Sequence, residues 1–484
     1  MNDRRLAAQS GMWSIILQWS RFGLNTVVFL ILARWLSLAE IGAFAVAFAP
    51  VNLLQLVQRA GVSETVVQGP EAPGSSTDTI FWMSTGFGLV MSVCVFGFSF
   101  AIAPIMESAE SETYLAAMAV IPALIGAAAV PEGLLRRRME IRTLAIRTTA
   151  SLTIAGLVAI WLGYAGYGGW ALTAFAIVNA AVSSVLVMML VRWTPAGGPR
   201  LEDARKALPV VAAISGRSLA NQAAMPLLQL MVGAGLGPAA AGAFQIAQRL
   251  ASLAATATLT PLRFATLPVF VRVRDDADRL RRTVVKTAGL ISFVSAPIYF
   301  GLLAVAPVLV PLAVGEANGP PSVPVLQALL LVGAHVGFFP VFVLAFTAIE
   351  RADVALRWSV GLFVLNMAIG AATVLWSATA TALGYSLLGY VAAPFMLRAL
   401  RAHTGVSARE MVEAVCRPVF AAVAMAAVIL LVGETLIGRI DDLALLAVEI
   451  GLGVAIYVVM SLLVCRPQIA TTRNLLVTLK PERL

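Results

Sequence analysis

The sequence predicts an all-α integral membrane protein with about fourteen transmembrane helices. Of its 484 residues, 60% are hydrophobic and 12% are charged, and the mean hydropathy is +0.90. An average soluble domain has about 25% charged residues. Apolar runs of roughly 20 residues alternate with short breaks that are charged or rich in glycine and proline. A water-soluble fold could not bury this much apolar surface, so a soluble protein is excluded.

Each apolar run is long enough to cross a ~30 Å hydrocarbon core. The first run follows Arg4 and Arg5 but is too long for the core of a signal peptide, so we expect it to remain as a helix. The ninth run is the longest and should tilt or break near Pro297 or Pro307. The runs cover 12–33, 41–67, 80–104, 114–135, 143–163, 168–192, 208–234, 240–265, 284–313, 324–348, 355–378, 380–398, 418–438 and 443–465.

Basic residues lie mostly in every second break between the runs. Of the 34 lysine and arginine residues, 27 fall on one side of the predicted membrane and 2 on the other. The positive-inside rule then predicts that both termini lie in the cytoplasm. The segment LLRRRMEIR at 134–142 is interpreted as a topology anchor. Topology and anionic headgroups account for the net charge of +9, so no nucleic-acid partner is expected.

The sequence lacks the marks of an enzyme. It contains no Walker A, HExxH or GxSxG motif, and the acids of the outer loops are scattered. The three cysteines lie in or beside spans and predict neither a disulfide framework nor a metal site. His335 is expected to contact a neighbouring helix, with a proton relay as the alternative. We therefore predict no catalytic residue and no metal.

An internal repeat relates the two halves of the chain. LSLAEIGAFAVA at 36–47 matches LGPAAAGAFQIA at 236–247, including an unbroken GAF. Upstream, RFGLN at 21–25 matches RSLAN at 217–221 in the form Arg-x-x-x-Asn. Both Arg-x-x-x-Asn motifs fall in the first helix of a predicted six-helix unit. The two units should therefore share one orientation.

The repeat predicts three parts. A six-helix N-terminal lobe covers 1–195, a six-helix C-terminal lobe covers 196–400, and two additional helices with a cytoplasmic tail cover 401–484. Parallel repeats of this kind are typical of secondary transporters, which bind substrate at the repeat interface near the middle of the membrane.

Arginines inside the predicted spans indicate a binding cavity. Arg21, Arg217 and Arg249 lie near span centres, where one charge facing lipid costs about 2.5–3.5 kcal/mol. They should therefore face water or protein, and no embedded acid matches them in number. Polar side chains follow the arginines at helical spacing, as in Gln245, Gln248 and Arg249. For single amides, hydrogen bonding between helices is the alternative.

Guanidinium groups bind phosphate through paired hydrogen bonds, and amides suit sugar hydroxyls. The cavity therefore predicts an anionic, lipid-linked glycan as cargo. The predicted substrate-binding residues are Arg21, Asn25, Arg59, Arg217, Asn221, Gln222, Gln245, Gln248 and Arg249.

Several stretches together resemble one transporter family. They include LARWLSLAEIGAFAVAFAPVNLLQLVQRAGVSETVVQ (32–68), LLRRRMEIRTLAIRTTASL (134–152), GYGGWALTAF (166–175), GAFQIAQRLASL (242–253), and the segments 263–284 and 302–333. The chain resembles flippases that move O-antigen or exopolysaccharide repeat units on undecaprenyl pyrophosphate, in the multidrug/oligosaccharidyl-lipid/polysaccharide exporter superfamily. It departs from the family's pattern at EANGPP (316–321), where a tryptophan is usual, and at AIERAD (348–353), where a glycine turn is common.

The resemblance implies two lobes in a V around a central cavity, and alternating access without a bound cofactor, coupled to a proton or sodium gradient. The expected function is a flippase of the bacterial inner membrane for cell-surface polysaccharide biosynthesis, such as lipopolysaccharide or exopolysaccharide. A polysaccharide polymerase and glycosyltransferases are its candidate partners. The alternatives are a peptidoglycan-precursor flippase or a multidrug exporter of the same superfamily, and then a membrane glycosyltransferase or ligase. A drug exporter should contain membrane-embedded acids for cation coupling.

Overall fold

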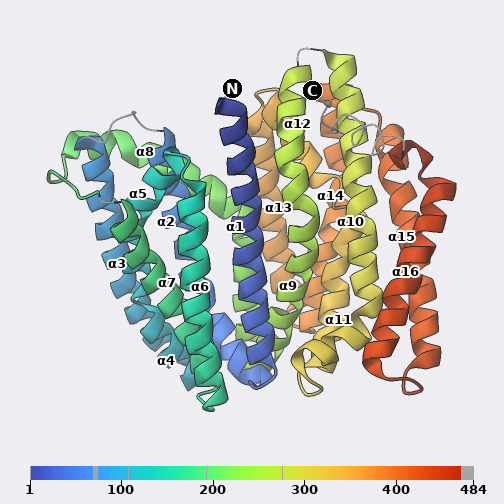
Figure 1. Cartoon of the computed structure of the whole chain (residues 1–484), viewed down its shortest axis with the longest axis horizontal. Helices are drawn as coiled ribbons and strands as arrows, with labels where there is room; N and C mark the ends of the chain where they lie inside the picture. The colour runs from blue at the N-terminus through green and yellow to red at the C-terminus, as the bar shows by residue number, and fades with distance from the viewer. Residues whose placement is uncertain (1, 69–74, 107, 192, 275, 470–484) are drawn as a thin grey trace. The chain divides into compact units, whose positions relative to one another are not determined.

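The structure, a computed structural model, describes residues 2–68, 75–106, 108–191, 193–274 and 276–469, and every regular element in these ranges is a helix (Figure 1). The first nine are α1 (Asn2–Ala33), α2 (Leu38–Gln68), α3 (Ser75–Met106), α4 (Ala109–Met118), α5 (Ile121–Arg137), α6 (Ile141–Tyr164), α7 (Trp170–Val191), α8 (Leu201–Gln222) and α9 (Ala224–Val273). They are followed by α10 (Ala277–Val314), α11 (Gly319–Leu330), the 3-10 helix η1 (Leu331–Ala334), α12 (Phe339–Ala348), α13 (Ala352–Thr373), α14 (Ala378–Thr404), α15 (Ala408–Leu436) and α16 (Asp442–Val464).

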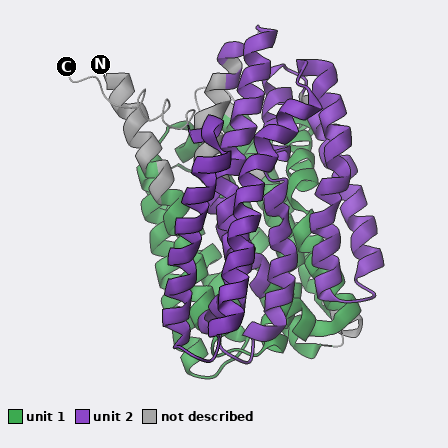
Figure 2. Ribbon diagram, turned by 90° about the vertical axis from the view of Figure 1, so that its right-hand side faces the viewer, with its two compact units in different colours: residues 1–245 green, residues 246–484 purple. Residues whose placement is uncertain are grey.

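The chain forms two compact units, residues 1–245 and 246–484 (Figure 2). Unit 1 has an apolar core that α2, α5 and α7 share, with Val66, Leu134 and Val187 buried in it. Unit 2 has a core around Phe342 and Phe346 of α12, against which α10, α14 and α15 pack. The predicted three-part division at 195 and 400 remains a prediction.

The all-helical membrane fold is confirmed, whereas the count of fourteen spans is not. Among the described residues, eleven helices are long and apolar enough to cross a membrane. The number rises to twelve if the pair Gly319–Ala334 and Phe339–Ala348, bent by 43°, is one span. A shorter apolar helix covers Leu17–Ala33. Helix α8 is not among the helices that are apolar enough to cross a membrane. Its first turns, LEDARK, are charged, and Arg217 adds a further charge.

Two expectations about the apolar runs need correction. The run 208–234 is divided, because α8 ends at Gln222 and α9 begins at Ala224. Pro226 follows the break, and a proline ring clashes with the carbonyl four residues before it, here that of Gln222. The ninth run was expected to tilt or break near Pro297 or Pro307. The break is absent, since α10 continues through both prolines from Ala277 to Val314, and the tilt remains a prediction. The tenth run is bent, between Ala334 and Phe339.

The repeated GAF motif occurs where two helices cross within unit 1. Helix α9 contains a non-helical residue, Gly237, with φ of 82° and ψ of 174°, so that a second helical part starts 200 residues after the start of α2. A Cβ atom on Gly42 would collide with the carbonyl oxygen of Pro238, and one on Gly242 with that of Leu38. The two backbones therefore touch reciprocally, and the motif's glycines permit that approach.

Candidate functional site

A buried carboxylate in unit 1 is the centre of an arginine cluster. Glu132 of α5 accepts hydrogen bonds from Nη1 and Nη2 of Arg147 on α6, at 3.2 and 3.3 Å, and from Nη2 of Arg136 at 2.7 Å. Glu132 is 8% exposed and Arg147 is 6% exposed. Arg136 lies one helical turn beyond Glu132, which is the spacing that brings two side chains together on a helix. The carboxylate therefore bridges α5 and α6.

Two predicted site residues extend this cluster. Arg21 of α1 and Arg59 of α2 both interact electrostatically with Glu132. The Nε atom of Arg59 is buried and has no hydrogen-bond partner among the described residues. One carboxylate thus faces four guanidinium groups, which leaves excess positive charge inside the helical bundle of unit 1. We refer to Arg21, Arg59, Glu132, Arg136 and Arg147 as the arginine cluster.

The space inside the cluster is small. Arg59, Glu132 and Arg147 line a recess of about 10 Å³, together with Ser63 and Ser183. This is room for about one water molecule. A larger anion would therefore meet the cluster at Arg21, whose side chain is exposed.

Polar side chains of three other helices fix the first half of α5. Gln58 of α2 donates to the carbonyl oxygen of Pro122 at 3.0 Å. Ser84 of α3 donates to Gly126 at 2.8 Å, and Ser184 of α7 donates to Leu124 at 3.0 Å. These bonds connect helices in the way that polar groups do inside membranes. They hold the first half of α5 in place, and Glu132 lies about two turns further along the same helix.

Arg217 has an acidic partner, contrary to the expectation that the span arginines lack one. Its Nη2 atom lies 3.7 Å from Oε2 of Glu64 on α2, and both side chains are about half exposed. Nearby, Ser215 donates to the carbonyl oxygen of Val57 at 3.0 Å, in a space that Gly61 leaves open. Helix α8 therefore packs on α2 and presents Arg217 at an accessible surface.

The other predicted site residues lie on three helices. Asn25 donates to the carbonyl oxygen of Arg21 in its own helix at 3.0 Å, and Gln222 donates to Ser218 Oγ at 3.0 Å. Asn221 is exposed on α8. Gln245, Gln248 and Arg249 are half-buried on one stretch of α9. The structure thus brings Arg21 and Arg59 together around Glu132, while the convergence of all nine residues on one cavity remains a prediction.

Three members of the cluster, Glu132, Arg136 and Arg147, were not predicted as site residues from the sequence. Arg136 lies in the basic segment 134–142, which is interpreted as a topology anchor, and the sequence predicts no role for Glu132 or Arg147. The spacing of four between Glu132 and Arg136 was the available signal. A further embedded acid, Glu449 of α16, is 2% exposed beside Gly433 and was also missed.

His335 contacts a neighbouring helix, as expected. Its Nε2 atom lies 3.1 Å from the carbonyl oxygen of Ser386 on α14, and its ring meets that of Tyr390 edge to face. A Cβ atom on Gly389 would collide with the imidazole ring. The side chain is thereby enclosed between η1 and α14.

Comparison with known proteins identifies the family. A family model described as "Polysaccharide biosynthesis protein" matches residues 31–318. The chain belongs to this family. The polysaccharide biosynthesis family member is 27% identical over 294 residues to succinoglycan biosynthesis transport protein ExoT of Rhizobium meliloti. It is 25% identical over 338 residues to lipopolysaccharide biosynthesis protein WzxC of Escherichia coli. These matches cover 61% and 69% of the chain, and 60% and 68% of the respective relatives.

Solved structures give the fold of the family member. It resembles lipid II flippase MurJ in an inward closed conformation, with a TM-score of 0.76 and 14% identity over 95% of this chain and 99% of that one. It also resembles an inward-facing multidrug resistance MATE family transporter, with a TM-score of 0.64 and 16% identity over 80% of this chain and 94% of that one. The chain therefore has the helical fold of these membrane transporters.

Proposed function

We propose that this member of the polysaccharide biosynthesis family is a flippase. It would move an oligosaccharide repeat unit linked to undecaprenyl pyrophosphate across the inner membrane by alternating access. The names of ExoT and WzxC, which refer to succinoglycan and lipopolysaccharide biosynthesis, support a polysaccharide substrate. The observation that carries the proposal is the arginine cluster, in which four guanidinium groups face one carboxylate within unit 1.

The cluster suits a pyrophosphate for electrostatic reasons. Buried positive charge is costly in a membrane protein unless an anion is close. Glu132 neutralises one charge and holds Arg147 and Arg136 in place. The remaining charge attracts an anionic group to the exposed Arg21, and guanidinium groups bind phosphate oxygens in pairs. Asn221, Gln222, Gln245 and Gln248 would bond the sugar hydroxyls, and no covalent step is required of any residue.

The direction of transport follows from the proposed orientation. Both termini lie in the cytoplasm, where the lipid-linked unit is assembled, and the glycan is released on the opposite side. A proton or sodium gradient would drive the cycle. Glycosyltransferases would supply the substrate and a polysaccharide polymerase would use the product.

The test is export of surface polysaccharide by a strain that lacks the native gene and carries single variants. We expect Arg21→Ala to reduce export about ten- to a hundred-fold, because a charge-assisted phosphate contact is worth about 1.5–3 kcal/mol. Arg59→Ala should also reduce export, because it removes positive charge that acts on an anion bound at Arg21. Export is normalised to the amount of membrane-inserted protein. Arg439→Ala, at an exposed position before α16, is the matched control and should export normally. Wild-type export by both cluster variants would exclude the proposed role of these arginines.

A peptidoglycan-precursor flippase is the second candidate, because the fold is shared along nearly the whole chain with lipid II flippase MurJ. Rescue of a strain depleted of its lipid II flippase, without restoration of surface polysaccharide, would favour that candidate. A multidrug exporter is the third candidate. The chain has embedded acids in Glu132 and Glu449, as cation coupling would require, but the names of ExoT and WzxC refer to polysaccharide biosynthesis and favour the glycan substrate.

A further inference from the structure

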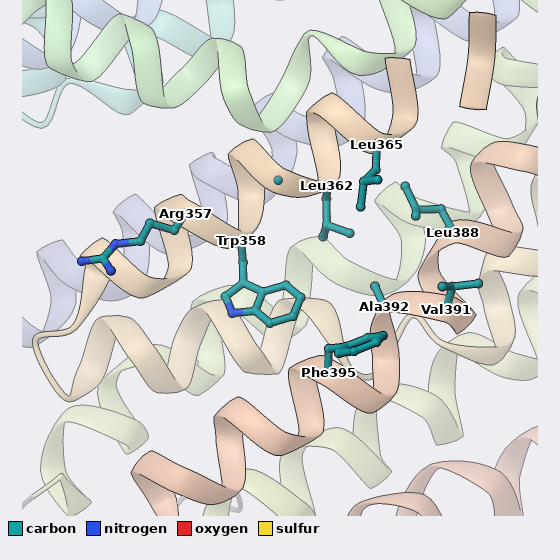
Figure 3. Close-up of a pocket in the computed structure, with 9 residues that line it drawn as sticks. Arg357, Trp358, Leu362, Leu365, Leu388, Val391, Ala392 and Phe395 are labelled. Carbon is teal, nitrogen blue, oxygen red and sulfur yellow. The ribbon is translucent and has the colours of Figure 1, made fainter. Parts of the chain in front are cut away.

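A groove between α13 and α14 lies within unit 2, apart from the arginine cluster. Its volume is about 330 Å³. Figure 3 shows Trp358 and Leu362 of α13 opposite Ala392 and Phe395 of α14, with Leu365 and Leu388 at one end. Gly361 also lines the groove, and a Cβ atom there would meet no other atom within 4 Å. The missing side chain of this glycine therefore leaves part of the groove open.

The other end of the groove is basic. Arg357 lines it there, and Figure 3 shows this side chain pointing away from the apolar residues. The guanidinium of Arg398 lies 5.6 Å from the centre of the Phe395 ring, which places a second positive charge one turn along α14. Asp353 is the nearby acid, and both Arg351 and Arg357 bond to it. Two arginines therefore share this carboxylate, and Arg398 adds a further positive charge on α14.

This combination is amphipathic in the manner of a membrane lipid. Within a bilayer, apolar walls alone do not select a ligand, because lipid tails are as apolar as leucine. Selectivity must come from the basic end, where each arginine near the membrane surface attracts anionic headgroups. Trp358 lies beside that end, and tryptophan is typical of the headgroup region.

We propose that the groove binds an anionic phospholipid of the surrounding membrane, with one acyl chain between α13 and α14 and the phosphate against Arg357 and Arg398. The α13/α14 groove is flanked by exposed apolar residues outside its lining, such as Val360 and Val364 of α13. A lipid can therefore enter from the side. A phospholipid such as phosphatidylglycerol has one phosphate, and the basic end of the groove offers two arginines, Arg357 and Arg398, to bind it.

The experiment measures lipid binding to the full-length protein in detergent by native mass spectrometry. The probes are phosphatidylglycerol, phosphatidylcholine of the same acyl length, and undecaprenyl phosphate. Gly361→Leu places a side chain in the groove. Its Cβ atom would meet no other atom within 4 Å, and leucine is a better helix former than glycine, so this variant should fold. Gly451→Leu is the matched control, because Gly451 on α16 has equally open space around its Cβ position.

We expect the wild type to bind phosphatidylglycerol in preference to phosphatidylcholine, and Gly361→Leu to bind it at least ten-fold more weakly than Gly451→Leu. Arg357→Gln and Arg398→Gln should each reduce the preference about five-fold, which corresponds to about 1 kcal/mol per arginine. Equal binding by the two leucine variants would overturn the proposal. So would the absence of headgroup preference, or stronger binding of undecaprenyl phosphate than of phosphatidylglycerol, which would assign the groove to the transported lipid.

Discussion

The carboxylate of Glu132 compensates the charge of Arg147, which is the buried arginine of the cluster. Replacing Glu132 with glutamine keeps the volume but leaves Arg147, 6% exposed, without a counter-charge. Breaking a buried ion pair on one side costs about 3–5 kcal/mol. We therefore expect Glu132→Gln to lower the thermal unfolding temperature of the detergent-purified protein clearly.

An exposed ion pair provides the comparison for this change. Glu202 of α8 bonds to Lys206 one turn later at 2.8 Å, with both side chains more than 70% exposed. Such pairs contribute less than about 1 kcal/mol, so Glu202→Gln should leave the unfolding temperature nearly unchanged. Equal shifts for the two glutamine variants would show that Glu132 does not stabilise a buried charge.

Single residues were predicted unevenly from the sequence. Arg21 and Arg59 stood out because arginine is rare inside apolar runs, and both lie in the cluster. Arg147 was not predicted because it follows a basic loop, where the positive-inside rule already accounts for basic residues. The partner of Arg217 was missed because Glu64 lies on another helix, and sequence distance does not show which helix faces which.

At the scale of helices, the crossing of α2 and α9 depends on two glycines. Gly42→Ala would place a Cβ atom against the carbonyl of Pro238, and neither backbone can move without disturbing its helix. We expect this variant to accumulate poorly in the membrane or to unfold at lower temperature. Gly97→Ala on α3 is the control, because no atom lies near its Cβ position and alanine favours a helix by about 1 kcal/mol. Normal accumulation and stability of Gly42→Ala would contradict the close crossing.

Helix boundaries could be predicted from the sequence where the composition changes sharply. They could not be predicted from the positions of prolines. The breaks before α2 and within α9 were marked by the repeated motif around Gly42 and Gly242. By contrast, Pro297 and Pro307 are accommodated inside α10, since neighbouring helices can support a proline-containing helix within a membrane. Proline alone therefore does not predict where a membrane helix ends.

At the scale of the whole molecule, the charge distribution predicts the orientation. The basic segments 136–142 and 272–286 should both face the cytoplasm. Reporter enzymes that are active only in the cytoplasm, inserted separately into the two segments, should both give signal. Labelling of either segment by a reagent restricted to the periplasm would contradict the proposed orientation of both termini.

The fold class was predictable from composition because a 60% hydrophobic chain with periodic breaks has few alternatives to a helical membrane bundle. The number of spans was less predictable, because α8 is amphipathic and α11 to α12 are bent. The site was predictable in kind, as intramembrane arginine, but its arrangement depends on contacts such as Glu132 with Arg147 that only the packed structure specifies.

The central claim is that the chain carries a pyrophosphate-linked glycan across a bilayer with the help of the arginine cluster. It is tested most directly by purified full-length protein in liposomes containing a fluorescent oligosaccharide linked to undecaprenyl pyrophosphate. Dithionite added outside bleaches only the outer leaflet, so crossing is read as bleaching beyond half. We predict near-complete bleaching with the wild type, clearly slower bleaching beyond half with Arg59→Ala, and bleaching that stops at half in protein-free liposomes. Bleaching that stops at half with the wild type, or proceeds equally with Arg59→Ala, would contradict the claim.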